Sequence, residues 1–280
     1  MPSFGVVIPT HNGSLLLDRS VGSLSRQAFA GELRADGVRV VVAVNDERAD
    51  SYARAVESRP PLAAAGIECT VIRTGPGRSA AIRAADGLLD GCPRLYLDQD
   101  AALSPNALDT LAAALAPGTG VHFAVPVLRL ARPRSRFSRA YYRVWRDLPY
   151  VLRSPVTCGA YAVSAAGRGR WAELPRLHSD DKWVRWHFAA HERRVVEAAS
   201  YEVVPPDGLV ALIRARHRYE RGNRELFTAG GAPPYPDDAI RRDGVVRSLV
   251  GHPARWPAAA VFAAVQGTVA VLGAWRGADR

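Results

Sequence analysis

The first half of the chain alternates short apolar runs with segments of helical periodicity, and this alternation restricts the fold more than any other feature. Residues 38–44 form an almost unbroken valine run. Runs without polar alternation are typical of strands buried on both faces of a sheet. Predicted strands lie at 4–9, 38–44, 67–72, 95–97 and 121–128, and predicted helices at 14–26, 52–57, 79–89 and 107–115. The pattern predicts an α/β fold with a doubly wound, mostly parallel sheet, helices on both faces and right-handed crossovers.

Four of these strands run into polar or glycine-containing segments. The residues concerned are Thr10, Asp46, Gly77, Arg78, Asp98 and Asp100. The carboxyl ends of parallel strands meet at one edge of an open sheet, where such sheets bind ligands. We therefore expect these side chains to lie near one another in a binding site.

The segment Asp98-Gln99-Asp100 follows the short apolar run at 95–97. Two carboxylates so close repel each other unless a cation or hydrogen-bond donors offset their charge. A hard divalent cation that also binds phosphate oxygens would do so. The alternative, that the pair caps the next helix, is weakened because Ser104-Pro105 supplies its own capping residues.

Gly77-Arg78 opens the predicted helix at 79–89. A phosphate there could meet both the Arg78 guanidinium and the amino end of the helix. An ordinary turn is the alternative, and the convergence with the carboxylates favours the phosphate. A dinucleotide-binding fold is disfavoured, because no GxGxxG motif follows the first strand.

The second half contains an acidic pair, Asp180-Asp181, at the start of a predicted helix. The helix macrodipole favours a carboxylate in the first turn, which accounts for Asp180. Asp181, directed into a cleft, could take a proton from an incoming hydroxyl. Earlier, small residues around Gly159 are expected to allow close backbone approach.

A basic helix is predicted at 209–221. Arg214, Arg218 and Arg221 share one face by their spacing, which is usual for a solvated surface. Gly222-Asn223 predicts the end of this helix.

The net charge of +10 comes almost wholly from arginine, with Lys182 the only lysine. Such a balance suits acidic partners: nucleotide phosphates, anionic lipid headgroups or nucleic acid. Three scattered cysteines predict neither a disulfide framework nor a zinc site. The amino terminus lacks the pattern of a signal peptide, so a cytoplasmic protein is expected.

Five motifs now combine into a family resemblance. They are Val6-Val7-Ile8-Pro9-Thr10-His11-Asn12, Val44-Asn45-Asp46, Gly77-Arg78-Ser79-Ala80-Ala81, Asp98-Gln99-Asp100 and Asp180-Asp181. In this order and spacing they resemble family 2 inverting glycosyltransferases with a GT-A fold, over roughly residues 4–228.

The resemblance implies a nucleotide-sugar donor carrying UDP, GDP or dTDP. It implies Mg²⁺ or Mn²⁺ at Asp100, with Asp98 assisting near the ribose or sugar. Asp46 would contact the nucleobase, and Thr10 with Pro9 would line the nucleobase pocket. The activity would be that of a hexosyltransferase in glycan, glycolipid or polysaccharide biosynthesis, such as that of a cell envelope.

The resemblance also implies Asp181 as the general base, although the usual glutamate-aspartate pair is aspartate-aspartate here. The alanine-arginine-asparagine turn of the family is replaced by Ala81-Ile82-Arg83. The QxxRW box of processive enzymes is absent, and Arg218-Tyr219-Glu220-Arg221-Gly222 stands near its place. We therefore expect transfer of a single sugar, with Arg218 and Arg221 binding the diphosphate.

The expected organisation is a GT-A domain at 1–228, with a nucleotide-sugar half at 1–128 and an acceptor half at 129–228, followed by a helical tail at 229–280. Residues 256–275 carry no charge, and Val261, Val265, Val269 and Leu272 form an expected stripe. Such a helix is expected to pack on the protein or lie at a membrane surface rather than cross a bilayer. The predicted acceptor is a saccharide or a lipid-linked molecule, possible membrane contact is peripheral on the inner face, and no nucleic-acid partner is expected.

Two other functions stay open at this point. A nucleotidyltransferase also uses paired carboxylates and a basic loop on an α/β sheet, and it would release pyrophosphate. A catalytically inactive basic binding or scaffold protein is the other, although Asp98, Asp100 and Asp181 are all present.

Overall fold

The computed structural model describes residues 3–11, 16–148, 151, 158–228 and 256–275. It divides into two compact units. Unit 1 comprises Met1–Arg129, Thr157–Arg176 and Asp180–Val203, and unit 2 comprises Leu130–Val156, Leu177–Ser179 and Val204–Arg280. The functional boundaries expected at 128 and 228 stay predictions, and residues 229–255, between the last two helices, lie outside the described residues.

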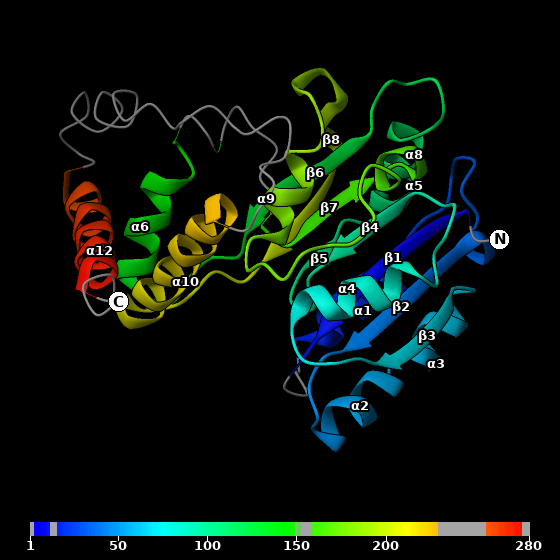
Figure 1. Ribbon diagram of the computed structural model, residues 1–280, viewed down its shortest axis with the longest axis horizontal. Helices are drawn as coiled ribbons and strands as arrows, with labels where there is room; N and C mark the ends of the chain where they lie inside the picture. Colours follow the sequence, from blue (N-terminus) through cyan, green and yellow to red (C-terminus); the bar gives the residue numbers. More distant parts are fainter. Residues whose placement is uncertain (1–2, 12–15, 149–150, 152–157, 229–255, 276–280) are drawn as a thin grey trace. The chain divides into compact units, whose positions relative to one another are not determined.

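Unit 1 is built on an eight-stranded sheet in the order β3-β2-β1-β4-β7-β6-β8-β5 (Figure 1). The strands are β1 Phe4–Thr10, β2 Val38–Val44, β3 Glu68–Arg73, β4 Arg94–Leu97, β5 Ala102–Leu103, β6 Phe123–Leu130, β7 Ala160–Val163 and β8 Arg193–Val203. The first four pair in parallel, and β7 lies antiparallel between β4 and β6. The predicted α/β fold with a mostly parallel sheet is confirmed.

One set of helices belongs to unit 1 together with the sheet, and a second set forms unit 2. Unit 1 contains α1 Leu17–Leu24, α2 Ala49–Val56, α3 Arg59–Ala64, α4 Arg78–Asp86, α5 Ala107–Ala114, α8 Ala165–Arg168 and α9 Asp180–Arg185. Unit 2 contains α6 Arg136–Trp145, α10 Leu209–Thr228 and α12 Trp256–Trp275. The predicted helices of the first half are therefore present, with shifted ends.

The centre of the sheet is held by apolar and aromatic packing. Every residue of β1 is buried, as expected for a strand covered on both faces. Tyr96 of β4 lies opposite Tyr161 of β7, and their rings stack with centroids 4.8 Å apart. Phe123 of β6 continues the stack, 5.7 Å from the Tyr161 ring. These aromatic pairs join the parallel strands to the antiparallel part of the sheet.

In unit 2 the uncharged helix α12 packs on α6 and α10. Its buried residues are Ala258, Phe262, Val265 and Val269, and Phe262 stacks on Tyr141 of α6 at 5.0 Å. The predicted stripe is right for Val265 and Val269, whereas Leu272 is 41% exposed. Among the described residues, no helix combines the length and apolar character needed to cross a bilayer.

Helix α10 does not end at Gly222-Asn223, so that prediction is wrong. The helix continues to Thr228, and Gly222 lies on its buried face. A β-carbon at Gly222 would lie 2.5 Å from Ser179 Oγ and 3.0 Å from His178 Cβ. This glycine serves close packing of the 177–179 segment rather than a helix stop.

Candidate active site

The site lies at the carboxyl edge of the parallel strands in unit 1. Thr10, the last residue of β1, is in register with Val44, the last residue of β2. Val44 is in turn in register with Arg73, the last residue of β3. Because the strands end level with one another, the loops that follow them open onto the same edge, as predicted.

Arg78 joins the two acidic motifs. It is the first residue of α4 and follows Gly77, whose φ of 101° favours glycine. The Arg78 Nη1 atom lies 2.5 Å from Asp98 Oδ1. Its Nε atom donates to both Asp180 carboxylate oxygens at 3.1 Å. One guanidinium therefore bridges the end of β4 and the first turn of α9.

Asp180 lies in the first turn of α9, as predicted, and its carboxylate is also buried. Its exposed fraction is 2%. Burial raises the pKa of Asp180 to about 6, against the opposing charge of Arg78 and with further increases from Asp181 and Asp98. Burial lowers the pKa of Arg78, but the charges of Asp180 and Asp98 outweigh it and leave that pKa well above its usual value. Arg78 thus stays a cation within a cluster of carboxylates.

The raised pKa of Asp180 predicts a pH dependence of stability. Between about pH 4 and pH 6 the folded chain keeps a proton on the Asp180 carboxyl. The unfolded chain, in which this carboxyl has its ordinary pKa of 3.8, has released that proton. The contribution of the Asp180 carboxyl to the free energy of unfolding is therefore fully present below about pH 4, and it is lost as the pH rises through about 6. We expect the free energy of unfolding of the wild type, measured in urea relative to Asp180→Asn, to fall by up to about 3 kcal/mol across this window. A difference that does not change with pH would contradict the burial of an ionisable Asp180.

Asp100 lies close to Asp98 in a partly buried position. Burial raises the pKa of Asp100, the charge of Asp98 raises it further, and Arg78 and Arg19 act in the opposite direction. A bound cation would offset both unfavourable effects, so the pair has the chemistry of a divalent-cation site. In the described part of the chain no three His, Cys, Asp or Glu side chains form a metal-holding group, so further ligands would have to be phosphate oxygens or water.

Gln99, between the two aspartates, fixes their loop to β1. Its Oε1 atom accepts a hydrogen bond from the Thr10 hydroxyl and another from the His11 backbone N–H at 3.2 Å. Thr10 is 2% exposed, and its buried hydroxyl donates the hydrogen bond that connects β1 to this loop. Sequence reasoning missed Gln99, because nothing in the motif distinguishes a spacer residue from a positioning residue.

Asn45 follows β2, and its side-chain amide can connect the end of β1 with the start of α4. It does so in the orientation in which both its nitrogen and its oxygen have hydrogen-bond partners. Its nitrogen then donates to Thr10 O at 2.9 Å, and its oxygen accepts from the Arg78 backbone N–H at 3.2 Å. The next residue, Asp46, accepts from the Arg48 backbone N–H at 3.0 Å. Pro9 is buried in β1. The structure thus places the predicted nucleobase residues at the same edge as Arg78.

Two further residues complete the surroundings of Asp98 and Asp180. The Asp98 backbone N–H donates to Gly159 O at 2.7 Å, and Gly159 has a φ of 117°. A β-carbon there would lie 3.1 Å from Val203 Cγ1, so the predicted close approach is confirmed. The Tyr161 hydroxyl is buried without a hydrogen-bond partner among the described residues. Burial and the nearby charge of Asp180 raise the pKa of Tyr161 well above its usual value.

Asp181 is half-buried in the first turn of α9, directly after Asp180. Its charge contributes to the raised pKa of Asp180, so both carboxylates belong to one electrostatic cluster. The structure therefore brings Arg78, Asp98, Asp100, Asp180 and Asp181 together in unit 1.

Arg218 and Arg221 lie in unit 2. Arg218 is exposed, with its guanidinium carbon 5.8 Å from the Tyr219 ring centroid. The Arg221 Nη2 atom lies 2.6 Å from His178 Nε2. His178 Nδ1 lies 2.7 Å from Glu225 Oε2, a partner that sequence reasoning missed. The role of the two arginines toward a diphosphate stays a prediction.

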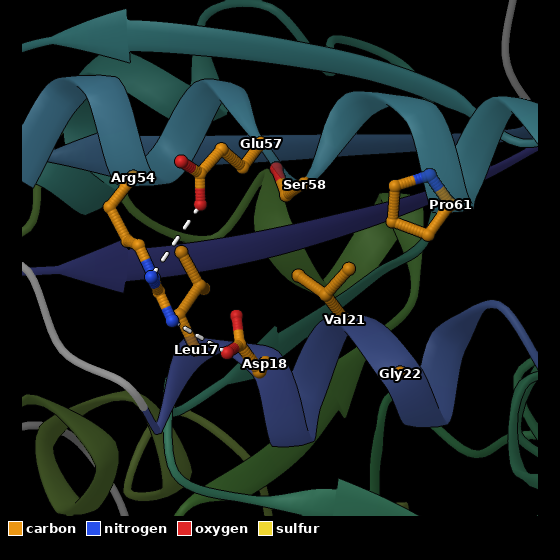
Figure 2. Close-up of a pocket in the computed structure, with 8 residues that line it drawn as sticks. All are labelled: Leu17, Asp18, Val21, Gly22, Arg54, Glu57, Ser58 and Pro61. Carbon is orange, nitrogen blue, oxygen red and sulfur yellow. Dashed lines mark hydrogen bonds and ion pairs between the residues drawn. The ribbon is translucent and has the colours of Figure 1, made fainter.

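A hollow of about 230 Å³ between α1 and the α2–α3 segment is separate from these residues (Figure 2). It is lined in part by Leu17, Val21 and Pro61. Arg54 at its edge forms ion pairs with Asp18 at 2.8 Å and Glu57 at 3.6 Å. None of the predicted site residues lines it, and its charged groups satisfy one another.

No family model matches the chain, and no curated protein matches its sequence. Solved structures do match its fold. The mannosyltransferase PcManGT from Pyrobaculum calidifontis, solved with GDP-Man and Mn²⁺, has a TM-score of 0.58 at 20% identity, covering 99% of this chain and 80% of its own. S. aureus TarS 1–349 in complex with UDP-GlcNAc has a TM-score of 0.54 at 13% identity, covering 99% and 92%.

Glucosyl-3-phosphoglycerate synthase from Mycobacterium tuberculosis, solved with Mn²⁺ and UDP-Glc, has a TM-score of 0.52 at 16% identity. This match covers 85% of the chain and 81% of the synthase. All three are GT-A-type glycosyltransferases. At these identities the likeness establishes the fold, and the chain has a GT-A-type fold.

Proposed function

We propose that the protein is a metal-dependent inverting glycosyltransferase that moves one hexosyl group from a nucleotide-diphosphate sugar to an acceptor hydroxyl. The observation that carries the proposal is the Arg78 bridge, which joins Asp98 and Asp180 at the carboxyl edge of the sheet. A charge cluster built around the buried carboxylate of Asp180 is costly for folding alone, and perturbed carboxylates concentrate at functional sites. The nucleotide-sugar complexes of the three structural neighbours support the same chemistry.

Asp100 is proposed as the main ligand of Mg²⁺ or Mn²⁺, with Asp98 assisting. The partly buried, mutually repelling carboxylates fit such an ion. When bound, the ion would neutralise charge on the leaving diphosphate. Gln99 holds the loop between them against β1, so the two carboxylates are positioned before the donor arrives.

The donor is proposed to lie along the strand ends. Pro9 and Thr10 would line the nucleobase pocket, and Asp46 would contact the base. Gly77 and Arg78 would place the amino end of α4 and a guanidinium near a phosphate. This assignment is compatible with Arg78 holding Asp98, since a guanidinium carries five donors. Arg218 and Arg221 are proposed to contact the diphosphate.

Asp181 is proposed as the general base. In an inverting displacement the acceptor hydroxyl attacks from the side opposite the diphosphate, and its proton must move to a base as the new bond forms. Asp181 is half-buried and hence reachable, whereas Asp180 is buried against Arg78. Asp180 then acts as a positioning residue for the guanidinium.

The acceptor is proposed to be a saccharide or a lipid-linked molecule, used at the inner face of a membrane to which the enzyme binds peripherally. The acceptor half would be residues 129–228, followed by the tail at 229–280. The arginines of the tail at 241, 242, 247 and 255 lie outside the described residues.

Thermal shift with UDP-, GDP- and dTDP-sugars, each with and without Mn²⁺, tests the proposal. A ligand that binds only the folded state raises the melting temperature. We expect one donor series to stabilise the wild type only when Mn²⁺ is present. The variant Asp100→Asn should keep its fold and lose both this shift and metal-dependent transfer.

The same samples, incubated with acceptors, separate the alternatives. A glycosyltransferase releases a nucleoside diphosphate, whereas a nucleotidyltransferase releases pyrophosphate. Binding without release of either product would indicate an inactive binding protein. Transfer by Asp100→Asn at the wild-type rate would exclude the metal assignment.

A further inference from the structure

The charge of the chain is divided very unevenly between the two units. Unit 1 has 19 Arg and Lys residues and 19 Asp and Glu residues, so it is neutral. Unit 2 has 18 Arg residues against 8 Asp and Glu residues, which is the whole net charge of +10. Arg218 and Arg221 are proposed to contact the diphosphate, which leaves most of the arginine excess of unit 2 without a role in the proposed sugar transfer.

The arginines of unit 2 are exposed along two helices. On α6 the exposed arginines are Arg136, Arg139 and Arg143. Their spacing of three and four residues places them on one face, while Tyr141 and Val144 are buried. On α10 the exposed arginines are Arg214, Arg218, Arg221 and Arg224. Their spacing of four, three and three residues also places them on one face.

Exposed apolar side chains gather in the same unit. Eight of the eleven large hydrophobic residues exposed in the described part of the chain belong to unit 2. The most exposed are Val210 at 61%, Trp256 at 58% and Val271 at 57%. Val210 stands at the start of α10, one turn before Arg214 on the same face. Apolar groups interspersed among arginines are unfavourable for a surface that faces only water.

Helix α12 adds an uncharged outer face. It contains no charged residue over its whole length. Its outward residues include Ala260, Ala263, Ala264, Gly267 and Val271. Because α12 contacts both α6 and α10, the uncharged face and the two basic faces belong to one helical cluster (Figure 1).

We propose that the peripheral membrane contact of the proposed function is made by unit 2, whose surface docks on an anionic lipid bilayer. Arginines attract the phosphates of anionic headgroups, while Trp256, Val210 and the outer face of α12 enter the boundary between headgroups and acyl chains. A nucleic acid or a soluble polyanion would use the arginines, but it offers no apolar layer for valine and alanine. The bilayer is the partner that accounts for both features of the surface.

Flotation of the full-length protein with lipid vesicles tests this proposal. We expect binding to vesicles of phosphatidylcholine mixed with phosphatidylglycerol, no binding to phosphatidylcholine alone, and release at high salt. The variant Arg136→Gln/Arg139→Gln/Arg143→Gln should weaken binding roughly a hundredfold, since each arginine near an anionic surface contributes several-fold. Trp256→Ser should weaken binding at constant net charge.

The matched control removes the same charge from unit 1. Arg26→Gln/Arg34→Gln/Arg59→Gln changes three exposed arginines and should bind like the wild type. Circular dichroism of each variant reports whether it folds. Equal weakening of vesicle binding by the two triple variants would overturn the proposed membrane surface. So would unchanged vesicle binding by Trp256→Ser combined with complete displacement of the protein from vesicles by soluble polyphosphate. The test reads vesicle binding alone, so its outcome does not depend on the proposed sugar transfer.

Discussion

Asp181→Asn is expected to lower turnover of bound donor by about a hundredfold or more, the range typical for loss of a general base. The substitution keeps the size of the side chain and the first turn of α9, so donor affinity should stay unchanged. The measurement is the rate of transfer at saturating donor, with donor affinity determined separately by calorimetry. A fall in kcat at constant donor affinity identifies an interaction made only as the reaction proceeds.

Asp180→Asn is the matched control for this variant, because it changes the neighbouring carboxylate in the same way. It removes one partner of Arg78, so we expect weaker donor or metal binding rather than a selective loss of turnover. If Asp181→Asn weakens donor binding and leaves the turnover of bound donor unchanged, Asp181 is a helix-terminal residue and not the base. If Asp180→Asn shows the selective loss of turnover, the base is Asp180.

The parallel half of the sheet could be predicted from local sequence. Residues 38–44 are a strand with the predicted bounds, because a valine run buried on both faces has no competing helical pattern. The strand at 95–97 is predicted for the same reason, and β4 differs from it only by the addition of Arg94. Turn chemistry also predicted the start of α4 near Gly77. The site edge follows from these elements, since parallel strands end on one side.

The partners within the site could not be predicted in this way. Arg78 and Asp180 are 102 residues apart, and their hydrogen bonds depend on how α4 and α9 pack. The macrodipole offered a sufficient local explanation for Asp180, so its burial left no separate signal in the sequence. The end of α10 could not be predicted from Gly222 for a similar reason: a glycine that ends a helix and a glycine that lets a neighbouring segment of the chain pack closely have the same local pattern.

Asp86, at the other end of α4, lies at the centre of a buried ionic network. Its Oδ1 atom accepts from Arg94 Nη1 and from the Tyr96 hydroxyl, both at 2.8 Å, and its Oδ2 atom accepts from Arg168 Nε at 2.9 Å. Arg94 and Tyr96 belong to β4, the strand that leads to Asp98. The network thus holds α4 against β4, and these two elements present Arg78 and Asp98 to each other.

Asp86→Asn is expected to lower the free energy of unfolding by about 3–5 kcal/mol, because it leaves the buried charge of Arg94 without its carboxylate. Urea unfolding at neutral pH measures this loss, and Asp90→Asn, which removes an exposed charge four residues away, should change stability by less than about 0.5 kcal/mol. Equal stability of the two variants would show that Arg94 is satisfied by its backbone contacts alone. Donor binding should then be compared at a lower temperature, at which Asp86→Asn is folded. It should remain weaker than in Asp90→Asn, because an α4 that is held less firmly positions Arg78 less accurately against Asp98.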